Sequence, residues 1–158
     1  MIENYLQILK ESLEKKIVVL DQIKELGERE SVLYQEETVD LEAFDKVLEE
    51  KDALADQLVK LDEGFETLYD RIREELQTDR SKYATQIETL QQLIGQVTDR
   101  TTAIQAQDKR LKMLFETGMS RQKQQIGQSR KSVKALKGYA QTRSTLSAAE
   151  SIYMDTKK

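Results

Sequence analysis

Apolar residues recur at alternating intervals of three and four positions along most of this chain, and this spacing is the feature that most constrains its fold. In an α-helix such intervals place side chains on one face, which helices bury against one another. None of the 158 residues is proline, so nothing sharply breaks a helix from within. Charged residues make up 34% of the chain, which is typical of long helices and coiled coils. The sequence therefore predicts an all-α protein.

Three apolar stripes separated by two short breaks predict three helices. The first helix is expected to end near Tyr34, and a break over 35–39 precedes Asp40, whose carboxylate can cap the next helix. The second break lies at 78–81, where capping residues recur. The first and third stripes consist of Leu6, Leu9, Leu13, Ile17, Leu20 and Ile23, and of Tyr83, Ile87, Leu90, Ile94, Val97, Thr101 and Ile104.

The second stripe is the most regular and continues for about five heptads. Lys51 is its one charged member, and we expect it at the edge of the helix. Acidic residues such as Asp56 and Asp62 are expected on a solvated face. The stripe consists of Leu41, Phe44, Leu48, Lys51, Leu54, Leu58, Leu61, Phe65, Leu68, Ile72 and Leu76.

The third helix is expected to be much longer than the other two. A helix over 80–138 would measure about 90 Å, against about 50–55 Å for each of its neighbours. Apolar residues thin out in its second half, and from residue 140 the chain is small and polar, a composition that stays disordered alone. We therefore predict an elongated antiparallel three-helix bundle or coiled coil with a long third helix and a flexible C-terminal arm.

The charge of the chain divides near the middle of this third helix. Residues 1–108 hold 13 basic and 26 acidic residues, whereas residues 109–158 hold 12 basic and 3 acidic residues. The sequence thus predicts two parts with different partners, an acidic helical bundle over 1–108 and a basic amphipathic arm with a flexible tail over 109–158.

Missing residue types argue against an enzyme. The chain has no cysteine and no histidine, which removes thiolate nucleophiles, the commonest general base and the commonest metal ligands. We expect no catalytic residues, no metal site and no cofactor. The N-terminus lacks the basic and apolar regions of a secretory signal, and no apolar run approaches membrane-spanning length. A cytoplasmic protein is expected.

The basic arm is the segment that most strongly suggests a binding function. Its apolar residues are too widely spaced for a core of their own, and they suit an amphipathic surface that pairs with a partner helix. Its lysines and arginines could also contact phosphates, but the chain as a whole is acidic and no basic leucine-zipper order is present, so we expect no nucleic acid. The apolar face is too sparse for stable membrane insertion. Dimerisation through the uncovered part of the third helix is plausible.

Several segments resemble the FlgN family of flagellar type III export chaperones. The run Asp40-Leu41-Glu42-Ala43-Phe44, followed by Glu49-Glu50-Lys51 and Leu54, is similar to the entry of the family's second helix. The opening from Tyr5 to Leu20 resembles its first helix, and residues 130–139 resemble its terminal helix. The family often has asparagines near the middle of its last long helix, where this chain has Gln105 to Arg110. The resemblance covers most of residues 2–140.

This resemblance implies a function for the arm. Such chaperones bind hook-associated proteins, which form the hook–filament junction, through a terminal amphipathic helix of the client. They prevent premature assembly and bring the client to the export gate. On this interpretation Tyr139 and Tyr153 are candidates for contact with an export-gate component. The expected client contacts are Leu111, Leu114, Phe115, Ile126, Val133, Leu136 and Tyr139.

Two other interpretations of the sequence stay open. A structural or interaction protein of the coiled-coil type would show the same heptads and would not need the arm. A chaperone of another secretion system would have much the same sequence pattern. The sequence names neither the client nor the stoichiometry.

Overall fold

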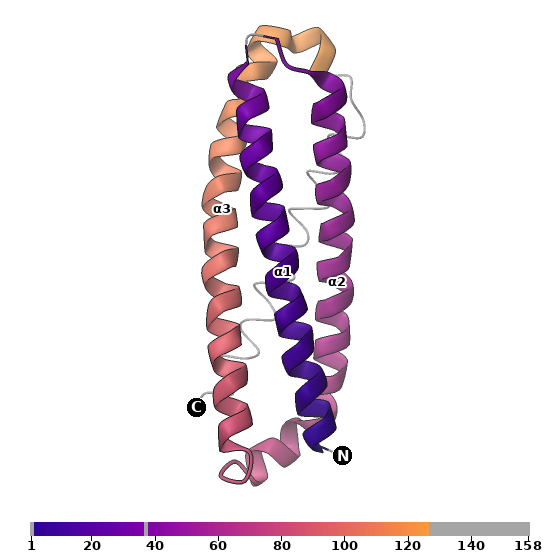
Figure 1. Cartoon of the computed structure of the whole chain (residues 1–158), viewed down its shortest axis with the longest axis vertical. Coiled ribbons are helices and arrows are strands. Elements are labelled where there is room, and N and C mark those ends of the chain that lie inside the picture. Colours follow the sequence, from indigo (N-terminus) through magenta and orange to yellow (C-terminus); the bar gives the residue numbers. More distant parts are fainter. Residues whose placement is uncertain (1, 37, 127–158) are drawn as a thin grey trace.

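The computed structural model describes residues 2–36 and 38–126, with side chains described as far as Thr117. It contains three helices, α1 (Ile2–Gln35), α2 (Leu41–Thr78) and α3 (Ala84–Ile126), arranged as a long antiparallel bundle (Figure 1). The prediction of an all-α three-helix architecture is confirmed. The third helix is the longest of the three, with 43 residues against 34 and 38. The predictions for the C-terminal tail concern residues 127–158, which lie outside the described residues.

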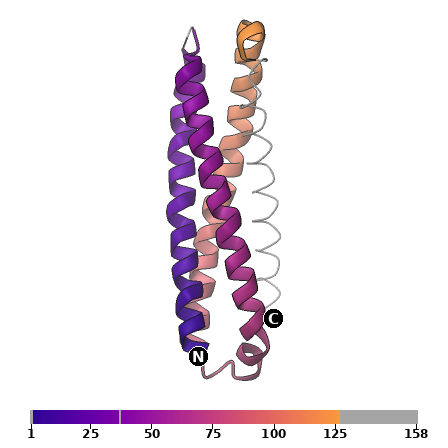
Figure 2. The ribbon, with the colours of Figure 1, turned by 90° about the vertical axis from the view of Figure 1, so that its right-hand side faces the viewer.

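The helices are not packed equally against one another. α1 lies between the other two and packs along both of them, whereas α2 and α3 hardly approach each other. In the view turned by 90°, α3 diverges from α2 toward the end of the bundle where α2 begins (Figure 2). The bundle is therefore closed on the side of α1 and open between α2 and α3.

Both breaks in the helical pattern lie close to where the sequence predicts them. Asp40 is the N-cap of α2, and its carboxylate Oδ1 accepts a hydrogen bond of 3.1 Å from the backbone N–H of Ala43. Such a cap satisfies one of the backbone donors that a helix start leaves without a partner. α2 ends at Thr78, and a short turn leads to α3 at Ala84. At the predicted domain boundary, between residues 108 and 109, α3 continues without a break.

Most buried residues of α1 and α2 form a set with a strict heptad register, and Val19, Leu26 and Val47 are buried beside this set. Steps of three and four alternate without interruption, which is the register of knobs-into-holes packing. The set in α1 is Ile2, Leu6, Leu9, Leu13, Lys16, Leu20, Ile23, Gly27, Glu30 and Tyr34. The set in α2 is Phe44, Leu48, Lys51, Ala55, Leu58, Asp62, Phe65, Tyr69, Ile72 and Leu76.

This register differs from the stripe that the sequence predicts for α2. Leu54, Leu61 and Leu68 belong to that stripe, but in the structure they are half-buried and flank the core. Their places are taken by Ala55, Asp62 and Tyr69, one position further along the chain. The choice of the largest apolar residue at each turn misled the prediction, because a small or charged side chain can fill a core position when its neighbours accommodate it.

The prediction that Lys51 lies at the edge of its helix is wrong. Its side chain is buried, and its Nζ donates a hydrogen bond of 2.9 Å to Oε1 of Glu30, itself buried on α1. Burial of a lone ammonium group would be very costly, and the carboxylate of Glu30 offsets that cost. Periodicity placed Lys51 in the core face correctly, but its partner lies on another helix.

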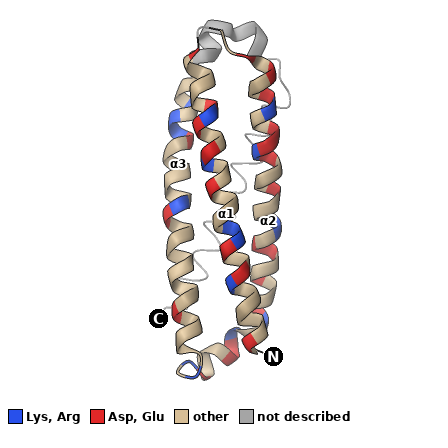
Figure 3. Ribbon diagram, viewed as in Figure 1, with Lys and Arg blue, Asp and Glu red and all other residues tan. Residues whose placement is uncertain are grey.

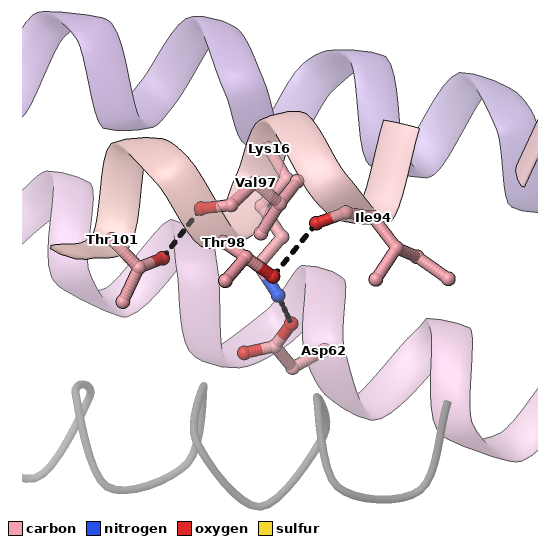
Figure 4. Close-up of polar contacts among 6 residues, drawn as sticks. All are labelled: Lys16, Asp62, Ile94, Val97, Thr98 and Thr101. Carbon is pink, nitrogen blue, oxygen red and sulfur yellow. Dashed lines mark hydrogen bonds and ion pairs between the residues drawn. The ribbon is translucent and has the colours of Figure 1, made fainter. Parts of the chain in front are cut away.

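The expectation of a solvated Asp62 is also wrong. Asp62 is 3% exposed, and its Oδ1 accepts a hydrogen bond of 2.6 Å from Nζ of the buried Lys16 (Figure 4). The nearby hydroxyls of Thr98 and Thr101 donate to carbonyl oxygens of their own helix, at 2.9 and 2.8 Å. Among the residues that the structure describes, the second carboxylate oxygen of Asp62, Oδ2, has no hydrogen-bond partner. Burial raises the pKa of Asp62, and the charge of Lys16 opposes that rise only in part.

Candidate functional site

Three of the predicted client contacts come together at the end of the bundle where α1 meets α2. Leu111 is 4% exposed, and Leu114 and Phe115 are half-buried beside it. They pack in a second apolar cluster that is separate from the main core. The remaining members of this cluster are Leu33, Tyr34, Val39, Leu41, Phe44 and Leu48.

An aromatic group from all three helices forms the centre of this cluster. The rings of Tyr34 and Phe44 have centroids 5.6 Å apart, and Phe115 lies 6.0 Å from each of them. Aromatic pairs in such geometries contribute about 0.5–1.5 kcal/mol each beyond the burial of their area. Phe115 is thus held in place by α1 and α2, although it belongs to α3.

A buried polar network borders the aromatic group. The Tyr34 hydroxyl donates a hydrogen bond of 3.1 Å to Oε2 of Glu30, whose other oxygen accepts from Lys51. Burial, and then the charge of Glu30, raise the pKa of Tyr34, so its hydroxyl stays protonated and continues to donate. The Lys51–Glu30 bond joins α2 to α1 and favours the one register of the two helices in which these side chains meet.

Beside this cluster, α1 and α3 enclose an open groove with a volume of about 610 Å³. Leu111 and Leu114 lie in its wall, together with Met113, whose side chain is 69% exposed. The polar part of the wall includes Lys24 and Arg110. We call this the α1–α3 groove. It presents apolar side chains between charged ones, which is the pattern that amphipathic helices recognise.

α1 and α3 approach each other closely at one edge of the α1–α3 groove, where Gly27 and Gln107 meet. The side chain of Gln107 lies against Gly27, where an added Cβ would come within 2.0 Å of its Oε1. From this position Gln107 Nε2 donates a hydrogen bond of 2.9 Å to the backbone carbonyl oxygen of Lys24. Alanine at position 27 would therefore displace the Gln107 side chain and break its hydrogen bond to Lys24.

Sequence reasoning missed Met113, Gly27 and Gln107 as residues of this region. A signal existed for one of them, since a glycine inside a helix costs about 1 kcal/mol relative to alanine and usually has a packing reason when it is kept. Met113 and Gln107 gave no signal, because single exposed methionines and glutamines are common on helices.

The other predicted contacts are not placed beside the groove. Ile126 is the last described residue of α3, and its side chain is not described. Val133, Leu136, Tyr139 and Tyr153 lie outside the described residues. Their predicted roles in client and export-gate contact stay predictions.

Within residues 2–36 and 38–126, no three acidic side chains gather in a way that could hold a metal ion. No helix in the same part of the chain is long and apolar enough to cross a membrane. Comparisons of the chain with protein families, with characterised proteins and with solved structures found no match.

Proposed function

We propose that this protein is a cytosolic flagellar export chaperone, without catalytic activity, which binds hook-associated proteins through a terminal amphipathic helix. It would prevent their premature assembly and deliver them to the export gate. The family resemblance of the sequence suggests the flagellar client. The α1–α3 groove is the observation that carries the binding role.

The groove suits an amphipathic helix in shape and in chemistry. Its apolar wall includes Met113, whose unbranched side chain adapts to different partner surfaces, and Leu114, which lies one residue along α3. Lys24, Glu28 and Arg110 in the wall provide charges of both signs for the polar flanks of a client helix. Binding in this mode buries the client stripe that would otherwise drive self-association.

The core of the protein makes this wall rigid. Leu111 is part of both the groove and the second apolar cluster, where Tyr34, Phe44 and Phe115 hold it. A pre-formed wall lowers the entropy that binding must overcome. It also means that deletion of residues 109–158 would remove core residues, so such a deletion cannot test the binding function cleanly.

The test is isothermal titration calorimetry with a peptide of the terminal helix of a hook-associated protein. We expect Met113→Asp to weaken binding at least tenfold, a loss of about 1.4 kcal/mol. Val18→Asp is the matched control, since Val18 is 56% exposed on α1 and is not part of the groove. Circular dichroism of both variants should show unchanged helix content.

Three results would contradict the proposal. No binding by the unmodified protein would favour a coiled-coil protein with another partner. Equal binding of an unrelated amphipathic helix of the same length would remove the flagellar specificity and leave a chaperone of another secretion system. Equal weakening by Met113→Asp and Val18→Asp would show that the groove is not the binding surface.

A further inference from the structure

On the open side of the bundle an apolar pocket lies between α2 and α3, lined by residues of the main core. Its apolar lining comes from three residues of α2 and three of α3, at the end of the bundle where α2 leads into α3. They are Phe65, Tyr69 and Leu76 on α2, and Ile87, Leu90 and Ile94 on α3. Between this pocket and the Phe44–Phe115 pair at the other end of the bundle, α2 and α3 hardly approach each other. We call this surface the α2–α3 trough.

The chain leaves the described structure at a position from which it can enter this trough. Figures 1 and 2 together show that the last turns of α3 lie across the end of the bundle, on the side away from α1 and toward the start of α2. A continuation from Ile126 into the trough would run parallel to α2 and antiparallel to α3. Such a direction needs no long connection.

The remaining chain is long enough to run beside most of α2. Residues 127–158 would form a helix of about 48 Å, and α2 with its 38 residues measures about 57 Å. Within this segment Leu136, Tyr139, Leu146 and Tyr153 are separated by three or seven positions, so a helix would place them on one face. That face could fill an apolar trough.

The charges of the segment and of α2 are complementary. α2 has 12 acidic and 5 basic residues, and the red of Asp and Glu is prominent along its ribbon in Figure 3. Residues 127–143 hold five basic residues and no acidic one, whereas the first half of α2, residues 41–56, holds six acidic and two basic residues. The two acidic residues of the segment, Glu150 and Asp155, come later, as do Arg73 and Arg80 at the far end of the trough. Charge therefore favours the same parallel direction as the chain path.

We infer that residues 127–158 dock in the α2–α3 trough of their own chain as a fourth helix parallel to α2. The inference goes beyond the proposed function, since it concerns the protein without any client. It also has a consequence for that function, because Leu136 and Tyr139 cannot contact the trough and a client at the same time.

The test is a distance measurement between two nitroxide labels in the full chain, by double electron–electron resonance. The chain has no cysteine, so Gln57→Cys with Thr145→Cys gives two unique labelling sites. Both sites lie about 25 Å below the same end of the bundle if the segment docks, and the labels should then be about 20–30 Å apart. A segment that continues away from the bundle places them about 50 Å apart or more.

Two variants of the labelled protein relate the distance to the apolar face. Val133→Asp with Leu136→Asp should move the distribution to long distances. Gln141→Asp with Ala148→Asp adds the same charge on the opposite face of the helix and should leave the short distance in place. Because these changes lie outside α1, α2 and α3, they alter no contact among these three helices.

Two outcomes would overturn the inference. A long or very broad distribution in the unmodified protein, with no short component, would show that the segment does not dock. A short distance that disappears on dilution with unlabelled protein would show that the segment docks in the trough of a second copy. Neither outcome affects the calorimetric test of client binding, which uses a peptide and the α1–α3 groove.

Discussion

Replacement of Lys16 by methionine should strongly destabilise the bundle, because it leaves a buried carboxylate without its partner. The side chains of Lys16 and Asp62 are 3% and 4% exposed, so solvent cannot take the place of the missing ammonium group. Within the described part of the chain, Asp62 would then have no partner for Oδ1, and Oδ2 has none already. Removal of one member of such a pair costs about 3–5 kcal/mol. A domain of this size has a total stability of about 5–15 kcal/mol, so the loss is large.

The double variant Lys16→Met with Asp62→Leu separates the cost of the orphaned charge from the value of the pair. Well-packed apolar replacements of a buried ion pair are often neutral or stabilising by about 1–4 kcal/mol. We therefore expect the double variant to be at least as stable as the unmodified protein. Urea unfolding followed by circular dichroism measures both variants. A loss below about 1 kcal/mol in Lys16→Met, or an equal loss in both variants, would refute the reasoning.

Three further predictions follow from the same contacts. The destabilisation by Lys16→Met should shrink as the pH falls from 7 toward 4. Burial raises the pKa of Asp62 in the folded state above its ordinary value of 3.8, so protonation of this carboxyl favours folding. Urea unfolding of both proteins at several pH values checks this, and a difference in stability that does not change with pH would contradict it. Phe44→Ala should lower the free energy of unfolding by about 3–5 kcal/mol, since Phe44 is 1% exposed at the centre of the aromatic group. A thermal midpoint close to that of the unmodified protein would count against this. The effect of Gly27→Ala on the free energy of unfolding should be about 1 kcal/mol more favourable in a Gln107→Ala background than in the unmodified protein, because the new Cβ then meets no glutamine side chain. A double-mutant cycle measures this difference. Additive effects would show that the close approach has no energetic role.

The number and type of helices could be predicted because they depend on local signals. Apolar spacing, the absence of proline and a capping aspartate at residue 40 act within one or two turns of the chain. The same signals placed Lys51 on the core face, although its burial was not expected. The boundaries agree within a few residues for the same reason.

The candidate site could be predicted only in part. The sequence singled out Leu111, Leu114 and Phe115 from their apolar character, and the structure brings all three to one end of the bundle. It did not indicate that Phe115 would stack on Phe44, because these residues are about 70 positions apart in the chain. It also did not indicate that Leu111 would be a core residue, because its burial depends on the packing of α3 against the other helices. Binding of a client at these positions remains a prediction.

The sequence by itself determined that this chain forms long amphipathic helices with heptad spacing, since that property lies in the order of apolar and polar residues within each helix. Only the tertiary structure decided which charged residues are buried. Lys16, Glu30, Lys51 and Asp62 are ordinary surface residues by type, and their burial became possible because α1 and α2 pack in a register that joins Lys16 to Asp62 and Glu30 to Lys51. The cost of desolvating a charge depends on whether a partner from another helix meets it, and no local pattern in the sequence contains that information.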